Sequence, residues 1–232
     1  MWKQEAVWIG NNIEALNFSE HNISCLNIGS STKFYRESLK PYIFKYVIQP
    51  IERRGVITHL DAKPGVGVDI CGDLADPLFR SKVTGKKYEL ILCNNVLTHV
   101  PDPDHVYEII LKCLADDGFV ILSAPNQYPY CADPFDSKYR PKRADIESKL
   151  PTLQVIQFMR FESSETLLSR LIANKKLLLA FIFNIIVPRR GLRVWKNVVA
   201  DLFNLNRRFV TIGLVMHRQS RPVRHRESDD CR

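Results

Sequence analysis

The chain has 232 residues, enough for one large domain or for one domain with an insertion. Its 45% hydrophobic and 25% charged residues are typical of a soluble globular protein with a core, and no segment reaches the ~20 apolar residues of a membrane span. The formal net charge of +8 indicates a polyanionic or membrane-surface partner, or only a solvated basic face.

The six cysteines show no CxxC pair and no spacing typical of zinc ligands. Cys25 and Cys93 fall inside apolar, strand-like runs, where a thiol behaves as a small hydrophobic group. The first twelve residues lack the apolar stretch of a signal peptide. We therefore expect a cytoplasmic protein without structural disulfides and without a metal site.

Short apolar runs alternate with helical patterns over the first 125 residues. Strands are predicted at Ser24–Ile28, Val56–Leu60, Gly67–Ile70, Tyr88–Cys93 and Phe119–Ser123. One helix is predicted from about Ser38 to Ile48, ended by Pro50, and a second over His105–Leu114. The strands are continuous apolar runs, which indicates a parallel sheet covered on both faces.

The pattern changes after Pro125. Residues 126–143 are rich in Pro, Tyr and charge and are predicted to form a loop. Two further strands are predicted at Leu153–Phe161 and Arg208–His217. We expect one domain over 1–163 and 205–217, a helical insertion over 164–204, and a basic, disordered tail over 218–232.

Residues suited to an adenosine follow the predicted strands. Ligands of doubly wound sheets bind at the carboxyl ends of the strands. Gly29 allows close approach of the backbone, Asp61 can accept two ribose hydroxyl hydrogen bonds, and Asp73 can accept one from an exocyclic amine. A plain turn glycine is the alternative for Gly29.

A dinucleotide is poorly matched by the same loop. NAD binding needs G-x-G-x-x-G and an acid about 20 residues later. The chain has G-S-S-T-K-F from Gly29, and Asp61 lies 32 residues after that glycine. S-adenosylmethionine carries no phosphate, so a single glycine can suffice for it.

Three stretches carry a family resemblance: LNIGSST, HLDAKPGVGVDICGDLADP and YELILCNNVLTHVPDPDHVYEIILKCLADDGFVILSAPNQYPY. Over about Ser24–Leu150 and the last strand, the chain resembles class I S-adenosylmethionine-dependent methyltransferases of the methyltransferase-11-like group. The resemblance implies an α/β fold: a Rossmann-like, doubly wound, mostly parallel seven-stranded sheet with an antiparallel last strand. It also implies S-adenosylmethionine as cofactor. The implied cofactor-binding residues are Asn27, Gly29, Ser30, Ser31, Asp61, Asp73, Leu74, Asn94 and Asn95.

The chain departs from the family pattern at four positions. Asn27 stands where an acid is usual, Ser31 where a second glycine is usual, and Thr98 where the family often has Glu. Cys131 stands where relatives often have His. These departures leave open a methyltransferase-like binding protein with impaired catalysis.

The segment from Tyr128 to Arg140 is unusually aromatic for a loop and follows the fifth strand, so we expect it over the transferred methyl group. Packing of a lid is the alternative. A hydroxyl or protonated amine acceptor needs a general base, for which His99, Asp133 and Asp136 are candidates. His99 could instead cap the Pro-Asp-Pro turn. The candidate catalytic residues are His99, Tyr128, Asp133, Asp136 and Arg140.

The residues after the fourth strand, Asn94-Asn95-Val96-Leu97, do not match D/N-P-P-Y, which weighs against methylation of amides or exocyclic amines. We therefore predict a methyltransferase acting at oxygen on a small-molecule, glycan or lipid-linked acceptor. An RNA- or tRNA-modifying methyltransferase is the alternative that the basic tail favours.

The insertion contains Leu177–Val187, a nearly continuous apolar run flanked by Lys175-Lys176 and Arg189-Arg190. As a helix it would be about 16 Å long, half the ~30 Å of a membrane core. Three surfaces could cover the apolar side chains of this helix: the protein's own sheet, a second copy in a homodimer, and a membrane surface contacted by residues 170–196.

Overall fold

The computed structural model describes residues 1–18, 22–129, 135–187 and 192–219, and within 192–198 it describes side chains only for residues 195 and 196. No helix in these ranges is both long enough and apolar enough to cross a membrane. The cysteines at 25, 71, 93 and 113 are free thiols. The described part of the chain contains no cluster of three side chains suited to a metal ion.

Seven strands form one sheet in the order β3-β2-β1-β4-β5-β7-β6. Their bounds are Ile23–Ile28, Gly55–Asp61, Ile70–Cys71, Tyr88–Asn94, Leu114–Gln127, Gln154–Thr166 and Arg208–His217, for β1 to β7 in turn. β1 to β5 pair in parallel, and β7 runs antiparallel to both of its neighbours, β5 and β6. The predicted Rossmann-like sheet with an antiparallel last strand is confirmed.

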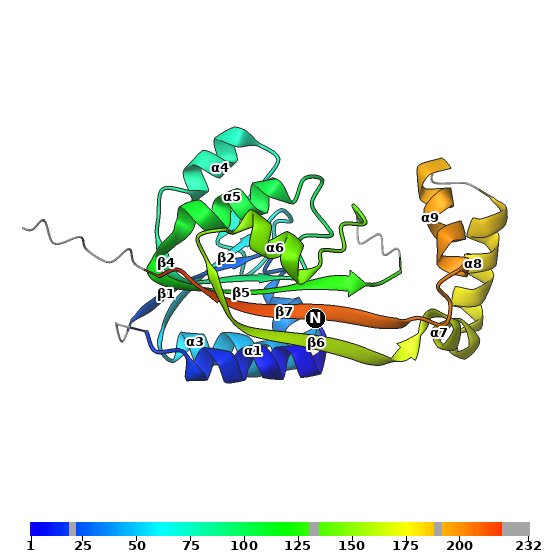
Figure 1. Ribbon diagram of the computed structural model, residues 1–232, viewed down its shortest axis with the longest axis horizontal. Helices are drawn as coiled ribbons and strands as arrows, with labels where there is room; N and C mark the ends of the chain where they lie inside the picture. The colour runs from blue at the N-terminus through cyan, green and yellow to red at the C-terminus, as the bar shows by residue number, and fades with distance from the viewer. Residues whose placement is uncertain (19–21, 130–134, 188–191, 220–232) are drawn as a thin grey trace, which may run out of the picture.

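Helices cover both faces of the sheet (Figure 1). On one face lie α1 (Lys3–Ala15) and a helical segment made of η1, α2, η2 and α3, with a bend at Lys40 between η1 and α2. On the other lie α4 (Pro77–Val83), α5 (Asp104–Cys113) and α6 (Arg143–Lys149). Each helical layer buries its apolar side chains against the sheet in a separate cluster, so the strands are buried on both sides.

The helix after β1 differs from the prediction. It begins earlier and contains two π-helical stretches, η1 (Tyr35–Leu39) and η2 (Phe44–Ile48), around α2 (Pro41–Ile43). The expected end at Pro50 is wrong, because Pro50 lies in the first turn of α3 (Gln49–Glu52). η2 runs directly into α3, so Pro50 lies inside a helical run, at the change from π- to α-helical hydrogen bonding.

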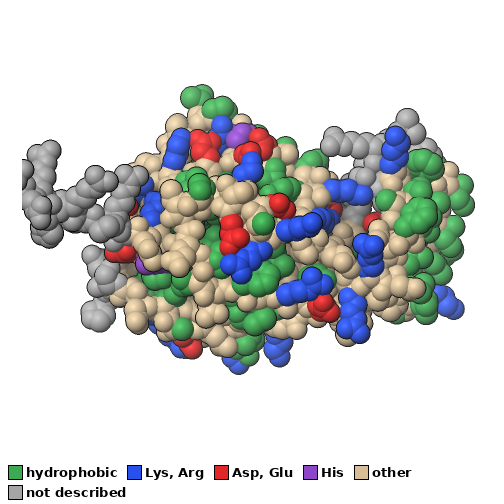
Figure 2. Space-filling model, in the orientation of Figure 1, with side chains coloured by type: hydrophobic (Ala, Val, Ile, Leu, Met, Phe, Trp, Pro, Cys, Tyr) green, Lys and Arg blue, Asp and Glu red, His purple; other side chains and the backbone are tan. Residues whose placement is uncertain are grey.

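Three further helices, α7 (Leu167–Ala173), α8 (Lys175–Ile186) and α9 (Leu192–Leu202), connect β6 to β7. They stand beyond the end of the sheet as a separate projection, here called the arm (Figure 1). Figure 2 shows apolar side chains gathered over α8 at the outer edge of the molecule. α8 buries none of its residues, so the expected alternative that it packs on the chain's own sheet is wrong.

Candidate functional site

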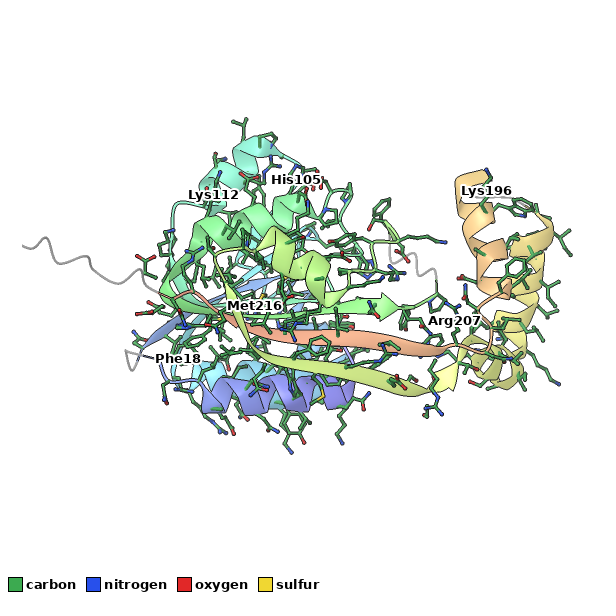
Figure 3. All side chains as sticks on the ribbon, in the orientation of Figure 1. Phe18, His105, Lys112, Lys196, Arg207 and Met216 are labelled. Atoms are coloured by element: carbon green, nitrogen blue, oxygen red, sulfur yellow. The ribbon has the colours of Figure 1, made fainter. Side chains whose placement is uncertain are left out.

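A cavity of about 540 Å³ opens at the carboxyl ends of β1, β2 and β4. This volume is within the range of small-molecule sites. The nine residues predicted to bind the cofactor all line it: Asn27, Gly29, Ser30, Ser31, Asp61, Asp73, Leu74, Asn94 and Asn95. His99 lines the same cavity, together with Asp102 and His105, which lies near the start of α5 (Figure 3).

The loop after β1 needs glycine at its first position for two reasons. Gly29 has a φ of +68°, in the left-handed region that glycine enters without steric cost. A Cβ atom added to Gly29 would lie 2.2 Å from Cγ2 of Val96, the residue that follows the two asparagines at the end of β4. The chain therefore turns sharply at Gly29, and its backbone forms one wall of the cavity.

Ser31, which replaces the family's second glycine, also lies in the left-handed region, with a φ of +56°. Its backbone N–H donates to Oδ2 of Asp61 over 2.7 Å. This bond helps to hold a serine in a conformation that glycine would adopt more easily. The departure at Ser31 is thus compatible with an ordered loop.

A buried guanidinium holds the loop after β1 through hydrogen bonds to its carbonyl oxygens. Arg36 is 4% exposed, and Nη1 donates to the carbonyl oxygens of Ser30 at 3.1 Å and Ser31 at 2.5 Å. Its Nη2 donates to the carbonyl of Gly67 at 2.9 Å, which ties the loop to the segment before β3. Burial lowers the pKa of Arg36, but an arginine stays protonated in proteins. Arg36 is a positioning residue that the sequence analysis missed.

Two acids stand at the ends of β2 and β3. Asp61 accepts the Ser31 N–H at Oδ2 and the Lys63 N–H at Oδ1, over 2.7 and 2.9 Å. A carboxylate has about four lone-pair sites, so each oxygen can still accept a further bond from a ligand in the cavity. Oδ1 of Asp73 accepts the backbone N–H of Ala75 at 2.8 Å, which fixes the turn that carries Leu74.

Asn27, which replaces the family's acid, pairs with a histidine on the neighbouring strand. Its Nδ2 lies 3.2 Å from Nδ1 of His59 in the buried space between β1 and β2. Burial, and then the charge of Arg36, lower the pKa of His59 to about 4, so this ring is neutral at pH 7. A neutral ring can accept the amide N–H at Nδ1, an interaction that suits an asparagine.

A carboxylate from α1 lies beneath the two asparagines of β4. Oε1 of Glu5, a residue only 1% exposed, accepts a 2.7 Å hydrogen bond from Nδ2 of Asn95. The Ser123 hydroxyl lies 2.5 Å from the same oxygen and 3.0 Å from Oδ1 of Asn94. Glu5 could not be predicted as part of this site, because nothing local marks an acid on an N-terminal helix as a neighbour of β4 and β5.

His99 is held by the loop that follows β5. Its Nδ1 lies 2.7 Å from the carbonyl oxygen of Phe135. A carbonyl only accepts, so Nδ1 carries the proton and the lone pair of the neutral ring is on Nε2. Ser137 bonds the carbonyl of Thr98 through both its N–H and its hydroxyl, at 2.8 and 3.2 Å. The loop and the His99 segment are thus joined by three contacts, and the expected position of the loop over the methyl group stays a prediction.

Three of the remaining candidate catalytic residues, Tyr128, Asp136 and Arg140, do not line this cavity. Asp136 is 7% exposed and forms a two-pronged ion pair with Arg140, at 3.0 and 2.7 Å. Arg140 also donates to the carbonyls of Tyr128 and Pro129. These contacts favour a structural role for Asp136 and Arg140, because the carboxylate is neutralised and occupied. Tyr128 and Arg140 line a smaller cavity of about 170 Å³. The fifth candidate, Asp133, lies outside the described residues.

Residues 20–171 match the family model described as a methyltransferase domain, and the chain belongs to that family. The matched segment is roughly two-thirds of the chain and includes the whole cavity apart from Met1. The protein is therefore an S-adenosylmethionine-dependent methyltransferase, and the predicted cofactor is confirmed. No curated protein sequence matches the chain.

Solved methyltransferase structures share the fold at low sequence identity. A candidate sarcosine dimethylglycine methyltransferase from Galdieria sulphuraria is 12% identical, with a TM-score of 0.54 over 93% of this chain and 86% of that chain. A candidate methyltransferase from Bacillus halodurans C-125 is 10% identical, with a TM-score of 0.52 over 91% and 99%. Coclaurine N-methyltransferase, bound to N-methylheliamine and SAH, is 12% identical, with a TM-score of 0.51 over 92% and 72%. Their likeness concerns the fold alone.

Proposed function

We propose that the protein transfers a methyl group from S-adenosylmethionine to a hydroxyl oxygen of a small-molecule, glycan or lipid-linked acceptor, with His99 as general base. The observation that carries the proposal is the 2.7 Å contact between Nδ1 of His99 and the Phe135 carbonyl. This contact leaves Nε2 as the basic nitrogen of a ring on the cavity wall.

The residues around Gly29 suit S-adenosylmethionine. Val96 fills the position that a Gly29 side chain would take, and Gly29 lines the cavity with its bare backbone, which a ligand can approach closely. Asp61 is placed to accept hydrogen bonds from the ribose hydroxyls, and Asp73 with Leu74 would face the adenine. When bound, the cofactor supplies a methyl group that is already activated by its sulfonium.

The chain's own contribution is then to bind, orient and deprotonate the acceptor. Nε2 of His99 would take the proton that the acceptor hydroxyl loses as its oxygen gains the methyl group. The Phe135 carbonyl stabilises the resulting imidazolium through its bond to Nδ1–H. The loop held by Asp136 and Arg140 keeps Phe135 in place and helps to exclude water from the acceptor side.

His99→Asn tests the base, because the amide nitrogen of Asn takes the position of Nδ1 and can donate to the Phe135 carbonyl, but Asn has no basic nitrogen. Labelled cofactor is incubated with aqueous, lipid and RNA fractions of a cell extract, and label uptake is measured. We expect methyl transfer to fall at least about 10²-fold while calorimetry shows cofactor affinity within about twofold of wild type.

The matched control is His105→Asn, since His105 lines the same cavity but its ring lies beside Asp102. It should retain transfer within a few-fold. Equal loss of affinity and turnover in His99→Asn would contradict the role of base. Label in the RNA fraction would favour the RNA-modifying alternative, and a wild type that binds no cofactor would favour a binding protein.

A further inference from the structure

The arm exposes an unusual share of the molecule's apolar surface. Of the 18 large apolar side chains exposed among the described residues, nine lie within residues 168–203. Ile172, Leu179 and Ile186 are 70%, 67% and 71% exposed, and Phe203 at the end of α9 is 85% exposed. Surface of this kind on one projecting element indicates an interaction site.

α8 carries two apolar stripes. Leu178, Phe181 and Ile185 are half-buried and recur at the spacing of one helical face, which packs on α7 and α9. The second stripe is exposed and has the spacing i, i+3, i+4, i+7: Leu179, Ile182, Phe183 and Ile186. The inner stripe packs within the arm, whereas Leu179 and Ile186 of the outer stripe stay 67% and 71% exposed.

The arm is anchored and has defined internal contacts. Nε1 of Trp195 donates to the carbonyl of Ile185 over 2.6 Å, which joins α9 to the last turn of α8. At the base of the arm, the Arg170 guanidinium lies 4.4 Å from the Phe209 ring centroid on β7 and pairs with Glu165 at 2.7 Å. The outer stripe therefore lies on an arm that is bonded internally and fixed to the sheet at its base.

The charge of the arm favours an anionic partner. Residues 167–207 contain eight Lys or Arg and one acid, Asp201. A homodimer through this surface would bring two strongly basic arms together, which like-charge repulsion opposes. Lys175 and Lys176 stand at the N-terminal end of α8, where the helix dipole disfavours cations, so their placement does not serve helix stability.

The length of α8 excludes a spanning role and suits an interfacial one. Its 12 residues make a helix of about 18 Å, well short of the ~30 Å membrane core. A helix with one continuous apolar stripe and lysines beside it lies along a lipid surface, with the stripe at the acyl boundary and the cations among head groups.

We propose that the arm docks on an anionic lipid surface through the outer stripe of α8, Leu179, Ile182, Phe183 and Ile186, with Lys175 and Lys176 against lipid phosphates. The arm follows the carboxyl end of β6, which is the edge of the parallel strands that carries the cofactor cavity. Where the proposed methyl transfer also holds, a docked arm would bring the active edge near the membrane, as a lipid-linked acceptor requires.

The test is flotation of the full chain with vesicles of phosphatidylcholine alone or with about 30% phosphatidylglycerol, at about 0.05 and 0.5 M salt. We expect flotation only with the anionic vesicles and mainly at low salt. Leu179→Ser with Ile186→Ser should lower the bound fraction about tenfold or more. Both side chains are exposed, so the melting temperature should stay within about 2 °C of wild type.

Matched controls separate the arm from general surface effects. Leu39→Ser with Leu78→Ser removes two equally exposed apolar side chains from the body of the molecule and should leave flotation unchanged. Lys175→Glu with Lys176→Glu should abolish binding, whereas Lys82→Glu with Lys86→Glu should retain it. A chain ending at Gln219 should still float, because the lysines of the arm and not the Arg-rich tail supply the contact.

Four results would overturn the proposal. The first is that the wild type does not float even at low salt. The second is that flotation is lost only when the tail is removed. The third is sedimentation that shows a dimer, which the Leu179 and Ile186 changes convert to a monomer. The fourth is salt-dependent binding of an RNA homopolymer that the arm variants abolish while vesicle binding persists. None of these measurements depends on methyl transfer, so the two proposals can fail separately.

Discussion

The cofactor edge of the sheet and the arm use equally apolar sequence in opposite ways. In β4 the side chains from Leu90 to Cys93 are fully buried between the two helical layers. In α8, an apolar run of similar strength buries no residue. Apolar content alone therefore does not place a segment in the core, because burial also needs a partner surface within reach.

The charged side chains of the two regions also differ in how many hydrogen bonds they make within the protein. At the cofactor edge, Arg36, Asp61 and Glu5 each make two or more hydrogen bonds within the protein. On the arm, Lys175 and Lys176 are exposed at the end of α8. The polar groups of the first region are fixed by bonds within the protein, whereas the two lysines of the arm face solvent.

The largest expected effect contrasts one leucine from each region. Leu92→Ala in β4 should lower the free energy of unfolding by about 2–5 kcal/mol, because the side chain is fully buried and a cavity would remain. Leu179→Ala in α8 should change it by no more than about 0.5 kcal/mol. Urea denaturation of both variants measures the difference. Equal losses would mean that the outer stripe of α8 is covered within the folded chain.

The second expected effect concerns the cofactor edge alone. Asp61→Ala should weaken S-adenosylmethionine binding by about 1.5–3 kcal/mol, the contribution of hydrogen bonds to a charged group. Isothermal titration calorimetry measures the affinity, and Asp102→Ala, on another part of the cavity wall, is the control expected to bind normally. Unchanged affinity in a folded Asp61→Ala protein would exclude the ribose assignment. Vesicle binding should be the same in both variants.

The smallest expected effect is a pH dependence from His59. Its pKa is about 4 in the folded chain against 6.5 for an unperturbed histidine, so the unfolded chain binds one more proton between these pH values. Stability must therefore fall as the pH decreases from 6.5 toward 4 and be fully present above 6.5. We expect a loss of about 1–2 kcal/mol between pH 7 and pH 5.

Urea denaturation of wild type and His59→Gln at the two pH values isolates this loss from that of other groups. The variant should lose less stability than the wild type on acidification. Parallel pH curves for the two proteins would show that the His59 ring is not held neutral by burial beside Asn27.

Local sequence determined most of the sheet and which residues line the cavity at its edge. The central strands are short apolar runs ended by turn residues, and the structure has β1 and β4 within one residue of their predicted bounds. Gly29 and Asp61 were identifiable because a parallel strand delivers its next residue to one edge of the sheet. α1 carries Ala6, Ile9 and Ile13 at helical spacing, so its omission was a missed local signal.

Only the tertiary structure decided which polar groups meet and which apolar face stays exposed. Glu5 reaches Ser123 across 118 residues of sequence, and His99 takes its tautomer from Phe135, 36 residues later. Asp136 resembled a base in the sequence, yet Arg140 neutralises it away from the cavity. The run in α8 could have served a core, but its position beyond the end of the sheet leaves the outer stripe exposed. These outcomes depend on distances between remote segments, which no local pattern specifies.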